Sequence, residues 1–201
     1  MFRLKELLLK IRALLSRFKA GGLDSPLAAA AAVALCLLEP GDLFAAGPAL
    51  APQTDPLPEG VSPADPLMAA GAACAQRRRN EGGAVVAAAE DTPRLYEAIS
   101  LAVRLGLPLV LLVSCREAAL DELSSRVMAA DMACIPADGR SVMKLMPALR
   151  LAIDKAREGD GPTLIECVCD QTPEDGDADD PLERLNGVLI LEGYATREEL
   201  Q

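Results

Sequence analysis

The sequence predicts an α/β fold in which a parallel sheet carries helices on both faces. Short, continuous apolar runs alternate along the chain with longer segments of helical periodicity, and this alternation is typical of strand–helix–strand units. The apolar runs lack polar alternation, as strands buried on both faces do. Of the 201 residues, 51% are apolar, which suffices for the core of one α/β domain.

The chain begins with helical and irregular segments. Residues 2–19 place leucine, isoleucine and phenylalanine at helical spacing, opposite a basic face. A second helix is expected from near Pro26, with Ser25 as its cap, to just before Glu39. Residues 47–66 contain six prolines, which predicts an extended connection without helix or strand. We therefore expect an N-terminal helical segment (1–46), a proline-rich connection (47–66) and an α/β domain (67–201).

The remaining elements follow in regular order. Helical periodicity or apolar runs indicate a helix, a strand, a helix, a strand, a helix, a strand, a helix, a strand and a helix. Their expected ranges are 67–79, 84–89, 94–105, 109–113, 117–130, 133–136, 141–158, 163–169 and 182–191. Pro147 is expected to kink its helix or to mark the true start. Thr196 and Glu199 have the spacing of a capping box that opens one last turn.

Composition excludes several classes of function. The net charge of −10 and the scarcity of aromatic residues argue against nucleic acid as a partner. The chain has no histidine, which removes histidine triads, histidine metal sites and the commonest general base. Its six cysteines lie mostly in apolar runs, where a reduced thiol packs as a small hydrophobe. We expect a cytoplasmic protein; the alternative is a cleaved signal, for which the apolar run 27–38 is a discontinuous match.

The first helix has an excess of basic side chains. Residues 1–20 carry six Lys or Arg against one Glu, a local charge of about +5. We expect this helix to pack on its own domain or on an oligomer partner. Docking on a membrane surface is the alternative for a basic amphipathic helix.

Several motifs, in their order along the chain, resemble one known family. The specific pieces are LYEAISLAVRLGLPLVLLV, REGDGPTLIECV and DDPLERL followed by LEGYATREEL, with LLLKIRALLSRFKAGG and LEPGDLF ahead of them. Together they resemble the α subunit of thiamine-diphosphate-dependent 2-oxo acid dehydrogenases, the first component of the pyruvate and branched-chain complexes. The resemblance spans nearly the whole chain, with several segments shortened. It implies the thiamine-diphosphate-binding fold and an oligomeric assembly.

The resemblance also locates the family's cofactor motif. That motif opens with Gly-Asp-Gly after one strand and closes with Asn-Asn after the next, and its aspartate and an asparagine hold Mg²⁺ against the diphosphate. Here the first three positions are Glu90, Asp91 and Thr92, and the asparagine pair falls on Cys115 and Arg116. Asp91 therefore matches the metal-binding aspartate, while both glycines are missing.

The substitutions in this motif oppose cofactor binding. A carboxylate at Glu90 would face a polyanion, and like charges about 4 Å apart repel by about 4 kcal/mol at an effective dielectric near 20. Cysteine is too soft to replace an amide oxygen on Mg²⁺. Arg116 could contact a phosphate directly, without metal. Asp91 also has a simpler interpretation as an ordinary helix cap. We expect thiamine diphosphate and Mg²⁺ not to bind, with Asp91 and Arg116 as the residual candidates.

The family's later catalytic loop is altered as well. Its arginine and its His-Ser pair fall on Gln171 and Asp175-Gly176, so no catalytic residue is assigned. Asp175, Asp177 and Asp179 alternate as in a calcium loop, but the glycine and the glutamate that such a loop requires are replaced, and a solvated acidic loop is expected. Cys167 and Cys169 lie on one face of a strand, where packing is expected rather than metal binding.

These observations predict a shortened relative of the dehydrogenase α subunit that acts as a pseudoenzyme, with a structural or regulatory role. By the resemblance, it would pair with itself, with a dehydrogenase α subunit or with a β subunit. Two alternatives stay open: an active thiamine-diphosphate-dependent oxidoreductase subunit with a divergent site, and a membrane-surface protein that docks through the basic helix.

Overall fold

The computed structural model describes residues 2–20, 26–46, 61–63, 65–80, 82–116, 120–169 and 180–200. These residues form seven helices and six strands. The helices are α1 (Phe2–Ala20), α2 (Ala28–Leu37), α3 (Pro66–Arg79), α4 (Pro93–Leu105), α5 (Leu120–Ala129), α6 (Val142–Glu158) and α7 (Pro181–Leu191). The strands are β1 (Leu43–Ala46), β2 (Val61–Pro63), β3 (Val85–Ala89), β4 (Leu109–Cys115), β5 (Ala133–Asp138) and β6 (Thr163–Val168).

The six strands form one parallel sheet in the order β2-β1-β3-β4-β6-β5. The apolar runs predicted as strands lie at its centre, where β4 pairs with β3 on one side and with β6 on the other. Every residue of β3 is buried, as expected for a strand covered on both faces. The α/β fold predicted from the sequence is confirmed.

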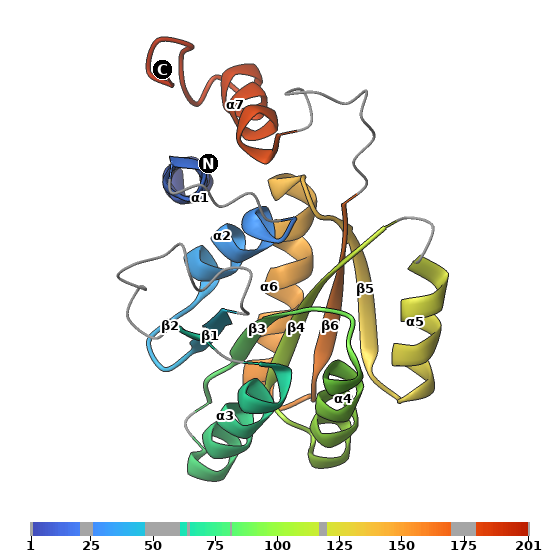
Figure 1. Ribbon diagram of the computed structural model, residues 1–201. Helices are drawn as coiled ribbons and strands as arrows, with labels where there is room; N and C mark the ends of the chain where they lie inside the picture. The colour runs from blue at the N-terminus through green and yellow to red at the C-terminus, as the bar shows by residue number, and fades with distance from the viewer. Residues whose placement is uncertain are drawn as a thin grey trace.

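Helices cover both faces of the sheet (Figure 1). On one face α3, α4 and α5 pack against alternate residues of β3 and β4, and Val85, Leu109 and Leu111 lie in that core. On the other face α1, α2, α6 and α7 form the second core with Val86, Val110 and Leu112. The alternation of β4 side chains between two cores follows from the pleat of a strand.

Helix α2 lies at the centre of the second core. Its sequence, AAAAAVALCL, has no polar side chain, and Ala28–Ala34 are each at most 8% exposed. Alanine carries only a methyl group, so the backbones of α1 and α6 can approach α2 closely on both sides. The apolar stripe of α1, including Leu8, Ile11 and Leu15, is buried against this core.

The start of the sheet differs from the sequence-based expectation. Strand β1 falls in the segment expected to be helical, and β2 falls in the proline-rich connection expected to contain no strand. Strand β2 is an edge strand that pairs only with β1, where Pro63 can be accommodated because one side of the strand needs no hydrogen bond. Helix α6 runs through Pro147 from Val142, so Pro147 does not mark its start.

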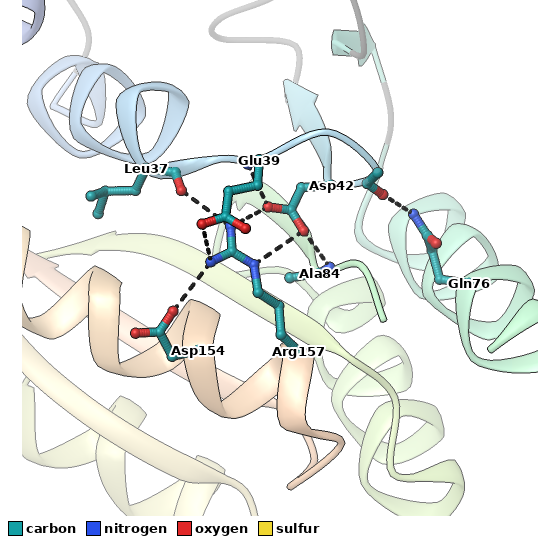
Figure 2. A network of polar contacts seen from close by, with 8 residues as sticks. Leu37, Glu39, Asp42, Gln76, Ala84, Asp154 and Arg157 are labelled. Carbon is teal, nitrogen blue, oxygen red and sulfur yellow. Dashed lines mark hydrogen bonds and ion pairs between the residues drawn. The ribbon is translucent and has the colours of Figure 1, made fainter. Parts of the chain in front are cut away.

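A buried ion pair joins the start of the sheet to the end of α6 (Figure 2). The Asp42 side chain, only 2% exposed, pairs with Arg157, and it also accepts hydrogen bonds from the backbone N–H groups of Glu39 at 2.8 Å and Ala84 at 2.7 Å. Arg157 further donates to the Leu37 carbonyl oxygen at 3.2 Å. This Asp42 network holds together three segments at the amino ends of β1 and β3, at the edge opposite the predicted cofactor motif.

The turn after β5 depends on a glycine. A Cβ atom added at Gly139 would lie 2.3 Å from Cys169 Sγ, closer than real Cβ atoms approach, and 3.1 Å from Cys167 Cβ, which is tighter than most real contacts. We expect Gly139→Ala to lower the free energy of unfolding by about 1–3 kcal/mol, since the turn or β6 must shift. Gly71→Ala on α3 is the matched control because nothing lies within 4 Å of its added methyl. Gly71→Ala should raise the free energy of unfolding, measured with urea, by about 0.5–1 kcal/mol. Equal effects of the two substitutions would contradict the steric argument.

Candidate functional site

The predicted cofactor motif lies at the carboxyl edge of the sheet. Because all strands are parallel, the segments after β3, β4, β5 and β6 emerge at this edge. The chain leaves β3 and β4 toward α4 and α5 on one face, and β5 and β6 toward α6 and α7 on the other. The connections therefore diverge between β4 and β6, the place where ligands bind in open parallel sheets.

Asp91 lies in the exposed turn between β3 and α4. Its carboxylate is not the cap of α4, since the N-cap residue is Thr92 and that interpretation of Asp91 is wrong. Instead, the Tyr96 hydroxyl donates to Asp91 Oδ1 at 2.8 Å, and Arg126 Nη1 on α5 donates to the same hydroxyl at 3.3 Å. The Arg126 guanidinium also lies 5.6 Å from the centroid of the Tyr96 ring.

The charges around Tyr96 explain its titration. Burial raises the pKa of Tyr96, Arg126 lowers it by its hydrogen bond, and Asp91 raises it. The Tyr96 hydroxyl therefore stays protonated and continues to donate its hydrogen bond to Asp91. The pKa of Arg126 is raised by its hydrogen bond to Tyr96 and by Glu122, so this side chain stays charged. Asp91 thus accepts a hydrogen bond from the first part of the helix that follows its turn.

Arg116 lies exposed immediately after β4, next to the half-buried Cys115. At this point the ladder between β4 and β6 continues, because the Cys169 N–H donates to the Cys115 carbonyl oxygen at 2.9 Å. The Gly139 N–H likewise donates to the Val168 carbonyl oxygen at 2.9 Å. These bonds draw the carboxyl ends of β4, β5 and β6 together at the predicted position of the diphosphate.

The residues at this edge do not fit Mg²⁺ and a diphosphate. Mg²⁺ requires a near-octahedral set of oxygen ligands, of which proteins usually supply carboxylates. Within the described ranges, no group of three or more His, Cys, Asp or Glu side chains is arranged to hold a metal ion. Asp91 is the motif position that matches the family's metal-binding aspartate. Cys115 offers sulfur where the family has an amide oxygen, and Glu90 places a second negative charge where a diphosphate would lie.

A buried polar cluster under α5 was not predicted from the sequence. Glu166 on β6 is 0% exposed, and the Ser124 hydroxyl donates to its Oε2 at 2.6 Å. Its second oxygen, Oε1, has no hydrogen-bond partner in the described part of the chain. Burial, followed by the charge of Glu166, raises the pKa of the neighbouring Cys134 thiol to about 12. The pattern TLIECV marks Glu166 only as an interruption of an apolar strand.

Some of the residues singled out in the sequence lie outside the part of the chain that the structure describes. The positions of the altered catalytic loop and of the calcium-like pattern are outside the described residues: Gln171, Asp175, Asp177 and Asp179.

Cys167 is fully buried in the core beside α6, and burial raises the pKa of its thiol. None of the six cysteines, all of which lie in the described ranges, forms a disulfide.

The basic first helix is held by the end of the chain. Arg12 Nε donates to Asn186 Oδ1 on α7 at 2.8 Å, and Lys19 forms an ion pair with Asp180. The apolar face of α1 is buried in its own domain, as expected for a helix that packs internally. No described helix combines the length and apolar character required to cross a membrane.

Comparisons with known proteins agree with this fold. A transketolase variant from Pichia stipitis aligns with a TM-score of 0.54 at 16% identity, over 82% of this chain and 36% of that chain. A transketolase from Campylobacter jejuni subsp. jejuni aligns with a TM-score of 0.56 at 15% identity, over 98% of this chain and 44% of that chain. The chain thus spans less than half the length of either enzyme, and at this identity the likeness concerns the fold.

The sequence comparison gives the family. No curated protein matches the chain. The family model described as dehydrogenase E1 component matches residues 57–181, which is more than half of the chain. This match confirms the resemblance inferred from the sequence motifs. The chain therefore belongs to the dehydrogenase E1 component family.

Proposed function

We propose that this chain is a non-catalytic subunit with a structural or regulatory role in a 2-oxo acid dehydrogenase assembly of the pyruvate or branched-chain type. The observation that carries the proposal is the hydrogen bonding of the Asp91 side chain. Of the two carboxylates in the cofactor motif, the one that matches the metal-binding aspartate accepts a hydrogen bond from the Tyr96 hydroxyl, at 2.8 Å. Family membership supports the assembly, and the altered motif supports the loss of catalysis.

The chemistry of the motif supports a lost cofactor site. A diphosphate approaches a parallel sheet closely only where glycines leave room and backbone N–H groups face it. Glu90 and Thr92 occupy those positions, and Glu90 places a second carboxylate beside Asp91. A metal ion on Asp91 would share that carboxylate with the Tyr96 hydroxyl, and a metal-bound diphosphate would bring its own negative charge next to Glu90.

An active subunit with a divergent site is the second candidate. It is favoured by the exposure of both Asp91 and Arg116, which leaves each side chain reachable from solvent at the same edge of the sheet. In such a subunit Arg116 would hold a phosphate oxygen directly, as guanidinium groups do. Membrane docking through α1 is disfavoured because the apolar face that would enter a bilayer is buried.

Calorimetric titration of the full chain with thiamine diphosphate and Mg²⁺ tests the proposal. We expect heats equal to those of dilution, and the same heats for Asp91→Ala, which removes the residual ligand. Tyr96→Phe, which releases Asp91 without changing the ring, is also expected not to bind. Micromolar, metal-dependent binding by the wild-type chain that Asp91→Ala abolishes would overturn the proposal in favour of the active subunit.

The assembly and the compartment are part of the same proposal. By family membership the partner is a dehydrogenase α or β subunit or a second copy of this chain. We place the protein in the cytoplasm, where six cysteines outside any disulfide would stay reduced. We also propose that residues 67–201 form the cofactor-domain equivalent, to which residues 1–46 add two helices and strand β1 and the connection 47–66 adds strand β2.

A further inference from the structure

The outer face of α4 is an exposed surface that combines apolar and charged side chains. Leu101 and Leu105 are 38% and 43% exposed, although most large apolar side chains of the described chain are buried. Pro93, Tyr96, Glu97, Ser100, Leu101 and Arg104 line a shallow hollow along this helix. We call these residues together with Leu105 the α4 surface.

The charges on the α4 surface are arranged symmetrically about its middle. Glu97 precedes the central pair Ser100 and Leu101 by three residues, and Arg104 follows that pair by three. Within the described residues, neither Glu97 nor Arg104 forms an ion pair. A helix with this pattern is complementary to an antiparallel copy of itself, since a two-fold axis at its centre places each Glu97 opposite the other Arg104.

We propose that the α4 surface is a self-association site, at which a second copy of this chain docks with its α4 antiparallel. This inference rests on the proposed role as an oligomeric subunit and assigns a partner and a surface to it. In the pair, two Glu97–Arg104 ion pairs flank a centre where Ser100 of each copy faces Leu101 of the other. Because Ser100 is small, only one of the two side chains that face each other at the centre is large, and the two helices can approach to about 8–10 Å.

Apolar contact and pre-organisation support the same partner. The antiparallel alignment also brings Tyr96 of one copy opposite Leu105 of the other, so that the exposed leucine gains an aromatic neighbour. Tyr96 is held by its hydrogen bonds to Asp91 and Arg126, and therefore loses little freedom on docking. A partner of unrelated sequence would need this complementary pattern independently, whereas a second copy supplies it by symmetry.

Sedimentation velocity of the full chain over a concentration series tests the surface. We expect a dimer that dissociates in the micromolar range, and a dissociation constant raised about tenfold or more by either Glu97→Arg or Arg104→Glu. Each reversal opposes like charges twice in the homodimer. An equimolar mixture of the two variants should regain the wild-type affinity, because each copy then meets the opposite charge on the other.

Matched charge reversals on the other face provide the control. Glu158→Arg and Arg150→Glu on α6 change the net charge by the same amounts and should leave the dissociation constant unchanged. A chain that stays monomeric at about 100 µM, or a dimer that neither α4 reversal weakens, overturns the inference. Association that appears only with an added dehydrogenase β subunit also overturns it. The calorimetric titration with cofactor is an independent measurement. A negative result for the α4 surface would therefore leave the proposed function unaffected.

Discussion

Replacing Asp42 by alanine is expected to lower the free energy of unfolding by about 3–5 kcal/mol, the cost of leaving a buried charge without its partner. Arg157, 18% exposed, would lose its shortest ion pair, and the backbone N–H groups of Glu39 and Ala84 would lose their acceptor. Arg157 would keep Asp154 at 3.2 Å, but that carboxylate is half exposed and its attraction is screened. The loss approaches the whole stability of a marginal domain.

Urea unfolding of the full chain measures this loss, with two further variants as references. Arg126→Ala removes the exposed ion pair with Glu122 together with the exposed contacts to Tyr96, and it should cost far less than Asp42→Ala because exposed charges are screened. The double variant Asp42→Ala with Arg157→Leu removes both charges, and it should be less destabilised than the sum of its single changes. An Asp42→Ala effect no larger than that of Arg126→Ala would show that the pair contributes nothing beyond a surface contact.

The centre of the fold could be predicted from the sequence because its signals are local. Strand β4 and the helix before it were predicted from an apolar run and from helical spacing, and both lie within two residues of the expected bounds. Each signal depends on neighbours in sequence that share one environment. The order of strands and helices then left few parallel topologies, since connections between parallel strands are almost always right-handed.

The first strands and the polar contacts could not be predicted, because they depend on residues far apart in the sequence. Strand β2 is three residues long and owes its conformation to pairing with β1. Asp42 meets Ala84 and Arg157, and nothing in the sequence near any of them marks the other two. Asp91 was predicted at the correct edge of the sheet, but its hydrogen bond to Tyr96 depends on the rotamers of both side chains.

Replacing Ser124 by alanine is expected to destabilise the fold by about 2–3 kcal/mol, more than a typical lost hydrogen bond. Ser124 supplies the hydrogen bond to Glu166 Oε2 at 2.6 Å, and Glu166 is fully buried with no described partner for Oε1. Without the serine hydroxyl, the buried carboxylate keeps only the Cys134 thiol, a weak donor, beside it among the described side chains, and most of its desolvation cost is uncompensated. Glu166→Met removes the charge at similar volume and should be neutral or stabilising.

The double variant Ser124→Ala with Glu166→Met separates this explanation from lost packing. If the cost of Ser124→Ala arises from the buried carboxylate, it should fall below about 1 kcal/mol when Glu166 is methionine. The Cys134 thiol gives a second readout: burial and then Glu166 raise its pKa to about 12, so Glu166→Met should lower that pKa while burial keeps it above 9.0. A lower pKa means more thiolate, and labelling of Cys134 at about pH 10 should be faster in the methionine variant. Unchanged labelling together with an undiminished Ser124→Ala cost would contradict the coupling of Ser124 and Cys134 to the Glu166 side chain.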